Sequence, residues 1–159
     1  KLTNNGKHTR YDNKTPRKID DFCRKLIRTP DYIPNLSTSN IMLKYAIKRH
    51  TYNWAEIFAY AVSKGAEFEK EFKVGDSLAT EILNLAIKQG HVPVVSFFLN
   101  QEVHITDDMI QLATGSLSKA KEFVEKEYCT TPSTPQVKSM EKIIEKLKAQ
   151  QLYQSWIKI

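Results

Sequence analysis

The segment 80–106, TEILNLAIKQGHVPVVSFFLNQEVHIT, carries the strongest pattern in the chain. Apolar residues recur near the helical period before Gly90, and a second apolar group follows it. The two groups are Ile82, Leu83, Leu85, Ala86 and Ile87, and then Val92, Val94, Val95, Phe97, Phe98 and Leu99. Because glycine breaks the pattern between them, we predict two helices joined by a tight turn. Neither helix can bury so much apolar surface alone, so the pair needs neighbouring helices.

The composition is that of an ordinary soluble globular domain. The 159 residues are 41% hydrophobic and 26% charged, which suits one domain or a short array of helical pairs. Only 5 Gly and 6 Pro argue against a loop-rich all-β fold. The net charge of +6 favours acidic proteins, phosphates or anionic membranes as partners.

Cysteine use and the absence of a long apolar run predict a reducing compartment, and we expect the cytoplasm. Cys23 and Cys129 show no metal or redox spacing, and Cys23 falls within an apolar stripe, so it is interpreted as a small core residue. No stretch has the length of a transmembrane helix. Because the chain starts at Lys1, and its Lys-, Ile- and Asn-rich composition suits an AT-rich genome, we expect a fragment of a larger protein. A bacterial effector acting in a host cytoplasm is one such source.

The first half of the chain predicts three helices after a polar basic arm at 1–14. Thr15-Pro16 starts the first, whose apolar stripe is predicted to be buried. That stripe is Ile19, Phe22, Cys23, Leu26 and Ile27. Ser39 is predicted to cap the second helix, which ends at Arg49, and Gly65 to end the third, over 54–64. Residues 67–75 are expected to form a charged, exposed linker.

The second half predicts three further helices. Thr106 caps one, Gly115-Ser116 is predicted to turn the chain, and Phe123-Val124 mark the partner helix beyond that turn. Residues 130–135 form a linker, and Thr134-Pro135 starts a long last helix over 136–156. Its predicted buried face is Val137, Met140, Ile143, Ile144, Leu147, Leu152 and Trp156. We expect that helix to pack across the end of the domain.

Three short segments share a pattern, which indicates an internal repeat. They are LKYAIKR at 43–49, LNLAIKQ at 83–89 and IQLATGS at 110–116, with Ala46, Ala86 and Ala113 at equivalent points. Small residues at these points allow two helices to approach closely. Repeated helix-turn-helix units of this kind are typical of solenoids.

The central segment resembles an ankyrin repeat. Ala86, Gly90-His91, Val94-Val95 and 97–99 stand where that family has its alanine, its Gly-His turn, its paired valines and its leucine run. Glu102 occupies the place of the family's glycine before the finger turn. The three equivalent alanines are separated by 40 and 27 residues, whereas the family's period is about 33. A helical bundle that contains one such hairpin therefore stays open as an alternative.

Taken together, these patterns predict an all-α protein of seven or eight helices. The helices form an irregular stack of ankyrin-like hairpins over 15–129, flanked by an N-terminal helix. The long C-terminal helix at 136–159 caps the same domain after the linker at 130–135.

No enzyme signature occurs in the chain, and no cofactor is expected. P-loop, GxGxxG, GxSxG and HExxH patterns are absent. His91 and His50 fall at predicted helical turns and are interpreted as structural. His104 near Asp107 and Asp108 lacks the three or four converging ligands of a metal site, so no metal is predicted.

The predicted function is therefore binding of another protein within a larger polypeptide. In ankyrin repeats the fingers and inner helices make the contacts, and the resemblance implies a corresponding set here. That set is Tyr52, Trp54, Gly65, Glu102 and His104. The alternative is a phosphate-bearing ligand, such as a nucleotide, a phosphoinositide or other anionic lipid head group, or RNA. It would use the basic N-terminal surface, formed by Arg10, Tyr11, Arg17, Lys18, Lys44, Lys48 and Arg49.

Overall fold

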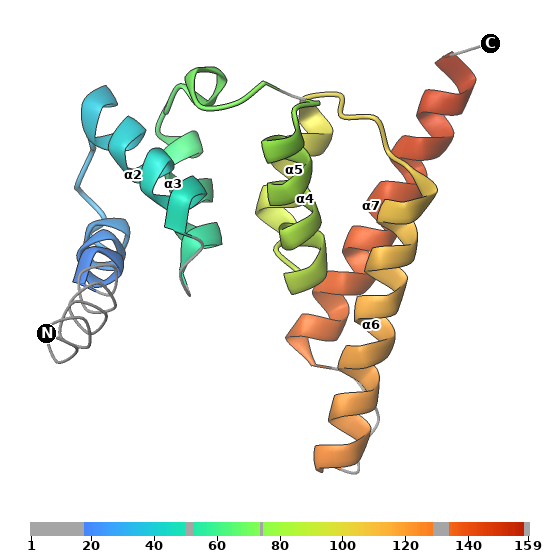
Figure 1. Ribbon diagram of the computed structural model, residues 1–159. Helices are drawn as coiled ribbons and strands as arrows, with labels where there is room; N and C mark the ends of the chain where they lie inside the picture. Colours follow the sequence, from blue (N-terminus) through green and yellow to red (C-terminus); the bar gives the residue numbers. More distant parts are fainter. Residues whose placement is uncertain (1–17, 50–52, 74, 129–133, 158–159) are drawn as a thin grey trace, which may run out of the picture. The chain divides into compact units, whose positions relative to one another are not determined.

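The computed structural model describes residues 18–49, 53–73, 75–128 and 134–157, and this part of the chain is all-α (Figure 1). It contains seven α-helices and one short 3-10 helix, and these residues form no strand. The chain divides into two compact units, Lys1–Glu71 and Phe72–Ile159, so the division falls inside the range expected to form one domain. No helix in the described ranges is long and apolar enough to cross a membrane.

The first unit is organised around a pair of packed helices. A helix over 18–27 precedes α2 (Leu36–Arg49) and α3 (Trp54–Ser63), and the 3-10 helix η1 (Phe68–Lys70) follows. Helices α2 and α3 lie side by side (Figure 1). Their facing apolar residues form the core of the unit. The most buried of these are Leu43, Ala46, Trp54, Ile57, Phe58 and Ala61.

Helix α2 begins one turn earlier than its sequence predicted. The Asn35 side chain accepts a hydrogen bond from the Thr38 backbone N–H at 2.8 Å, so Asn35 caps the helix. The prediction of Ser39 as the cap was wrong, because Ser39 lies inside α2 and is buried. Asparagine and serine are both favourable N-cap residues, and the helix begins directly after the first of the two, Asn35.

The end of α3 matches its prediction. Gly65 has a φ of 89°, its N–H donates to the Val62 carbonyl, and the Ala66 N–H donates to the Ala61 carbonyl, each at 3.0 Å. This pair of bonds is the Schellman motif, which needs a left-handed residue where glycine stands.

Two expectations for the first unit need correction. In the helix over 18–27 Cys23 is buried as expected, but Phe22 is 62% exposed, so the apolar stripe is covered only in part. In the segment 67–75, which crosses from the first unit into the second, the described residues are not all exposed. Asn40 binds Glu67 through its side chain, accepting from the Glu67 N–H at 2.8 Å, and Phe72 is buried.

The second unit contains four helices: α4 (Ser77–Gln89), α5 (Val92–Asn100), α6 (Asp107–Tyr128) and α7 (Pro135–Ile157). Gly90 ends α4 with a φ of 81°, and the His91 N–H donates to the Ala86 carbonyl at 2.9 Å. The predicted pair of helices with a tight turn at Gly90 is confirmed. Helix α4 packs on α5 and α6, and α7 packs on α5 and α6 (Figure 1).

Helix α6 runs unbroken through Gly115, and the predicted turn at Gly115-Ser116 was wrong. Apolar residues recur every three or four positions across that glycine. They are Met109, Ala113, Leu117, Ala120 and Val124. A glycine inside a helix lowers its stability by only about 1 kcal/mol relative to alanine. A continuous apolar face against α4 and α7 outweighs that cost.

Helix α7 starts as predicted but buries less of its length. The Thr134 hydroxyl accepts a hydrogen bond from the Val137 N–H at 3.2 Å, and Pro135 takes the first helical position. Val137, Met140, Ile143 and Leu147 are buried. Leu152 and Trp156 were wrongly assigned to the same face, because they are 53% and 65% exposed.

Candidate protein-binding groove

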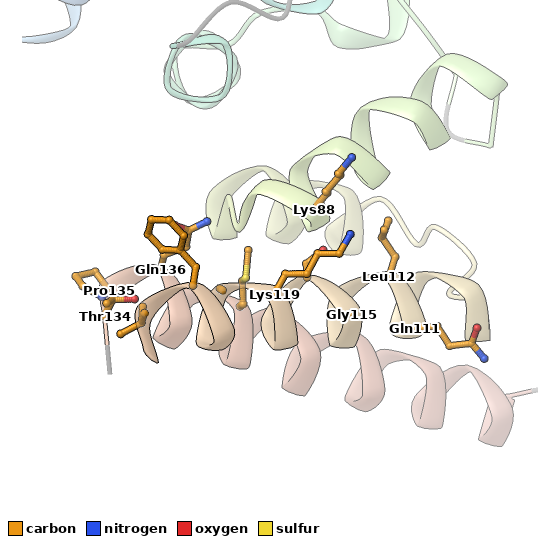
Figure 2. Close-up of a pocket in the computed structure, with 13 residues that line it drawn as sticks. Lys88, Gln111, Leu112, Gly115, Lys119, Thr134, Pro135 and Gln136 are labelled. Carbon is orange, nitrogen blue, oxygen red and sulfur yellow. The ribbon is translucent and has the colours of Figure 1, made fainter. Parts of the chain in front are cut away.

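A groove of about 790 Å³ opens on the second unit where α4, α6 and α7 meet. Helix α6 forms most of its floor, the last turn of α4 forms one wall and the first turns of α7 form another. Figure 2 shows Thr134, Pro135 and Gln136 at one end, Gln111 and Leu112 at the other, and Lys88 and Lys119 between them. The remaining lining residues are Gly115, Ser116, Ala120, Phe123, Val124 and Met140.

Two glycines determine the shape of this groove. Around Gly115 no atom lies within 4 Å of the position that a Cβ would take, so the floor is open there. A Cβ on Gly90 would lie only 3.4 Å from Met140 Cγ. The turn between α4 and α5 therefore packs closely on α7, and this contact helps to hold the wall in place.

The surface of the groove is mainly apolar. Phe123, which the sequence analysis used to mark a helix, is 59% exposed and lines the groove together with Leu112 and Met140. An exposed aromatic side chain beside other apolar groups is a common feature of sites that bind another molecule.

The charge in the groove is positive. Its described lining residues include Lys88 and Lys119 but no aspartate or glutamate. Farther along α6, the Lys126 amino group forms an ion pair with Glu122, with its Nζ 2.9 Å from a carboxylate oxygen. That hydrogen bond and the charge of Lys126 lower the pKa of the Glu122 carboxyl from its ordinary value.

The chemistry of the groove fits binding. Its described lining offers apolar contact and two cations, and includes no histidine, cysteine or carboxylate. Within the described ranges, no three His, Cys, Asp or Glu residues lie close enough together to hold a metal ion.

The residues predicted for protein binding fall in different places. Tyr52 lies outside the described residues. Trp54 is 1% exposed and packs edge-on against Phe58, with ring centroids 6.3 Å apart, so the structure removes it from the surface. Its position at the start of α3 turns the indole into the core of the first unit. Gly65 is exposed, at the other end of α3.

Glu102 and His104 lie together in the segment that joins α5 to α6. Both are exposed, and Glu102 has a φ of 58°, the one positive φ among the described residues other than glycine. His104 borders a smaller hollow of about 330 Å³ that is also lined by Asp107 and Gln154. These two residues belong to the second unit, whereas Trp54 and Gly65 belong to the first.

The described residues contain little of the predicted basic surface. Arg10, Tyr11 and Arg17 lie outside the described residues, as do His50, Cys129 and the side chain of Arg49. Lys18, Lys44 and Lys48 are exposed, and the Lys44 amino group lies 3.9 Å from a Glu71 carboxylate oxygen.

His91 lies at the turn between α4 and α5, as the sequence indicated. Its Nε2 lies 3.1 Å from the Gln89 side-chain oxygen, and partial burial lowers the pKa of its imidazole.

The sequence analysis did not identify the groove. Lys88, Lys119 and Leu112 look like ordinary helical residues, and Gly115 was assigned to a turn. The unbroken spacing of apolar residues through Gly115 is the signal that could have revealed a long helix with an open position in its middle.

Comparisons with protein-family models, with curated proteins and with solved structures give no match for this chain.

Proposed function

We propose that this chain is a non-catalytic protein-binding module and that the groove of the second unit receives a segment of its partner. The observation that carries the proposal is the mainly apolar lining of the groove, in which Phe123 of α6 is 59% exposed. Burial of such side chains supplies most of the free energy in protein association. The groove volume falls within the range of known ligand and peptide sites.

The proposal includes an ankyrin-like origin for the α4–α5 hairpin. Its support is the left-handed Gly90 between two short packed helices and the left-handed Glu102 where that family has glycine. Helix α7 would then act as the C-terminal cap of a short array. An array that stops in this way leaves its binding surface on the last hairpin and the cap.

The phosphate-bearing ligand is the weaker alternative. Among the predicted cations only Lys18, Lys44 and Lys48 have described side chains, and Lys44 lies near Glu71. Of these three, Lys44 lines a shallow hollow of about 350 Å³ together with Glu71, whose carboxylate would repel a phosphate. The open groove of the second unit therefore favours a protein partner.

A peptide-display selection against the purified chain tests the proposal. The decisive variant is Gly115→Trp, because no atom lies within 4 Å of the new Cβ and the large side chain would occupy the floor of the groove. Ser118→Trp is the matched control, since Ser118 is exposed on the same helix and does not line the groove.

We expect selected peptides to bind the wild type and the Ser118→Trp variant but to lose binding to Gly115→Trp. Circular dichroism would first establish that both variants keep the helical content and the melting temperature of the wild type. A selection that yields only peptides indifferent to Gly115→Trp would rule out the groove as the binding site.

A further inference from the structure

We infer that the partner segment is an acidic amphipathic α-helix of about three turns, lying along α6 with its carboxylates beside Lys88 and Lys119. This inference rests on the proposed function and adds the chemical class of the partner. It follows from the charge, the shape and the apolar side chains of the groove.

The charge of the groove selects an acidic partner. Lys88 lines the groove from α4 and Lys119 from α6 (Figure 2), and neither forms an ion pair with a described carboxylate. A basic segment would meet two like charges with no acidic group in the described lining. Opposite charges at an interface mainly set specificity and the rate of association, so these lysines discriminate between partners more than they add affinity.

The shape of the groove suits a helix. From Leu112 to Phe123 the floor of α6 spans roughly 16 Å at the rise of an α-helix, which equals the length of about three helical turns. Gly115 lies near the middle of this floor, with open space around it. Small residues let two helix axes approach to about 8 Å, the close end of the normal range.

The apolar groups supply the anchors. Leu112 lies towards one end of the α6 floor, Phe123 lies about three turns further along the same helix, and Met140 lines the groove from α7. A helix with apolar residues at i, i+3, i+4 and i+7 would place one apolar stripe over these groups. Carboxylates that flank such a stripe would come to the middle of the groove, where the two lysines lie.

Three synthetic peptides of roughly 15 residues, or about four helical turns, test the inference by titration into isotope-labelled chain. All three carry leucines at i, i+3, i+4 and i+7. The first has glutamates beside the leucines and the second has lysines there. The third is the acidic peptide with a central proline, which breaks a helix. Amide shifts of α4, α6 and α7 report binding in the groove.

The acidic helix should bind at least roughly tenfold more tightly than either other peptide, a difference of about 1.4 kcal/mol. The double variant Lys88→Glu with Lys119→Glu should reverse the preference between acidic and basic peptides. The control Lys142→Glu with Lys148→Glu changes the net charge equally at exposed positions of α7 outside the groove, and should keep the acidic preference.

Equal binding of the acidic and basic peptides, no shifts with the acidic peptide at millimolar concentration, or an unchanged preference after charge reversal would each overturn the inference. The proposed function fails separately. If display selection yields peptides that depend on an open Gly115 but are basic or non-helical, the groove binds a partner and only the acidic helix is wrong.

Discussion

The Gln154 side chain pairs with the backbone at Ile105 as a neighbouring strand would. The Ile105 N–H donates to Gln154 Oε1 at 3.0 Å, and Gln154 Nε2 donates to the Val103 carbonyl at 2.7 Å. Val103 and Ile105 are themselves buried, so their backbone groups need partners. One side chain from α7 therefore supplies hydrogen-bond partners for two backbone groups of the segment that joins α5 to α6. These bonds link the C-terminal helix to that segment.

Replacing Gln154 with alanine should lower the free energy of unfolding by about 1–3 kcal/mol, because the Ile105 N–H and the Val103 carbonyl lose their partner. Urea denaturation measures the change. Gln151→Ala is the matched control: it removes a 2.8 Å bond to Asp107 that is exposed to solvent, and should cost less than about 0.5 kcal/mol. Equal losses in the two variants would contradict the role given to Gln154.

Glu102→Gly should stabilise the chain by about 1 kcal/mol. Glu102 has a φ of 58°, a conformation that costs a residue with a Cβ about 1–2 kcal/mol and costs glycine little. Glu102→Ala removes the charge and keeps the strain, so it should leave the melting temperature near that of the wild type. A gain from alanine as large as that from glycine would show that charge, and not backbone conformation, limits stability here.

Gly115→Ala should raise the free energy of unfolding by about 0.5–1 kcal/mol, because alanine favours a helix interior and the added methyl group meets no atom within 4 Å. Thermal and urea denaturation both measure it. The same substitution in a left-handed turn would destabilise the protein. A loss of stability would thus support the turn that the sequence suggested and contradict a continuous α6.

Leu83→Ala should cost about 2–5 kcal/mol, because the Leu83 side chain is fully buried and its loss leaves a cavity. Phe97, predicted alongside it as a core residue, is only partly buried and contacts Phe98 at its edge, so Phe97→Ala should cost less than Leu83→Ala. Leu152→Ala tests the opposite case. Leu152 is 53% exposed, so its truncation should change stability by less than about 1 kcal/mol.

The stability of the chain should depend on pH through His91. Burial lowers the pKa of this imidazole, so the native state binds its proton less readily than the unfolded chain. Above about pH 6.5 both states are neutral and His91 has no effect. As the pH falls below that value the unfolded state is protonated first, and stability is lost until the pH passes the native pKa.

Urea denaturation at about pH 7.5 and about pH 5 measures this effect across the histidine range. The wild type should lose more stability between the two conditions than His91→Gln, which cannot take up the proton. Parallel losses in the two proteins would mean that other groups account for the acid sensitivity.

Local patterns predicted most of the helices and several of their ends. Gly65 and Gly90 took left-handed conformations, and Thr106 and Thr134 capped their helices, because such effects depend on residues within one turn. The same local rules failed at Ser39 and Gly115. At Ser39 the choice is between two possible helix starts, and at Gly115 it is between a turn and a continuous helix. The alternatives differ by about 1 kcal/mol, so packing against a neighbouring helix decides between them.

The sequence by itself determined the all-α class, the hairpin of α4 and α5 around Gly90, and most of the buried positions in that hairpin. Periodicity reports these features because each helix must turn one apolar face inward. Only the tertiary structure decided which apolar residues stay exposed. By their spacing in the sequence, Phe123 and Trp156 resemble core residues. The family resemblance, in contrast, assigned Trp54 to a contact surface. The exposure of Phe123 and Trp156 depends on how α6 and α7 pack in the second unit, and the burial of Trp54 depends on the packing of α3 on α2; no residue within one turn specifies either.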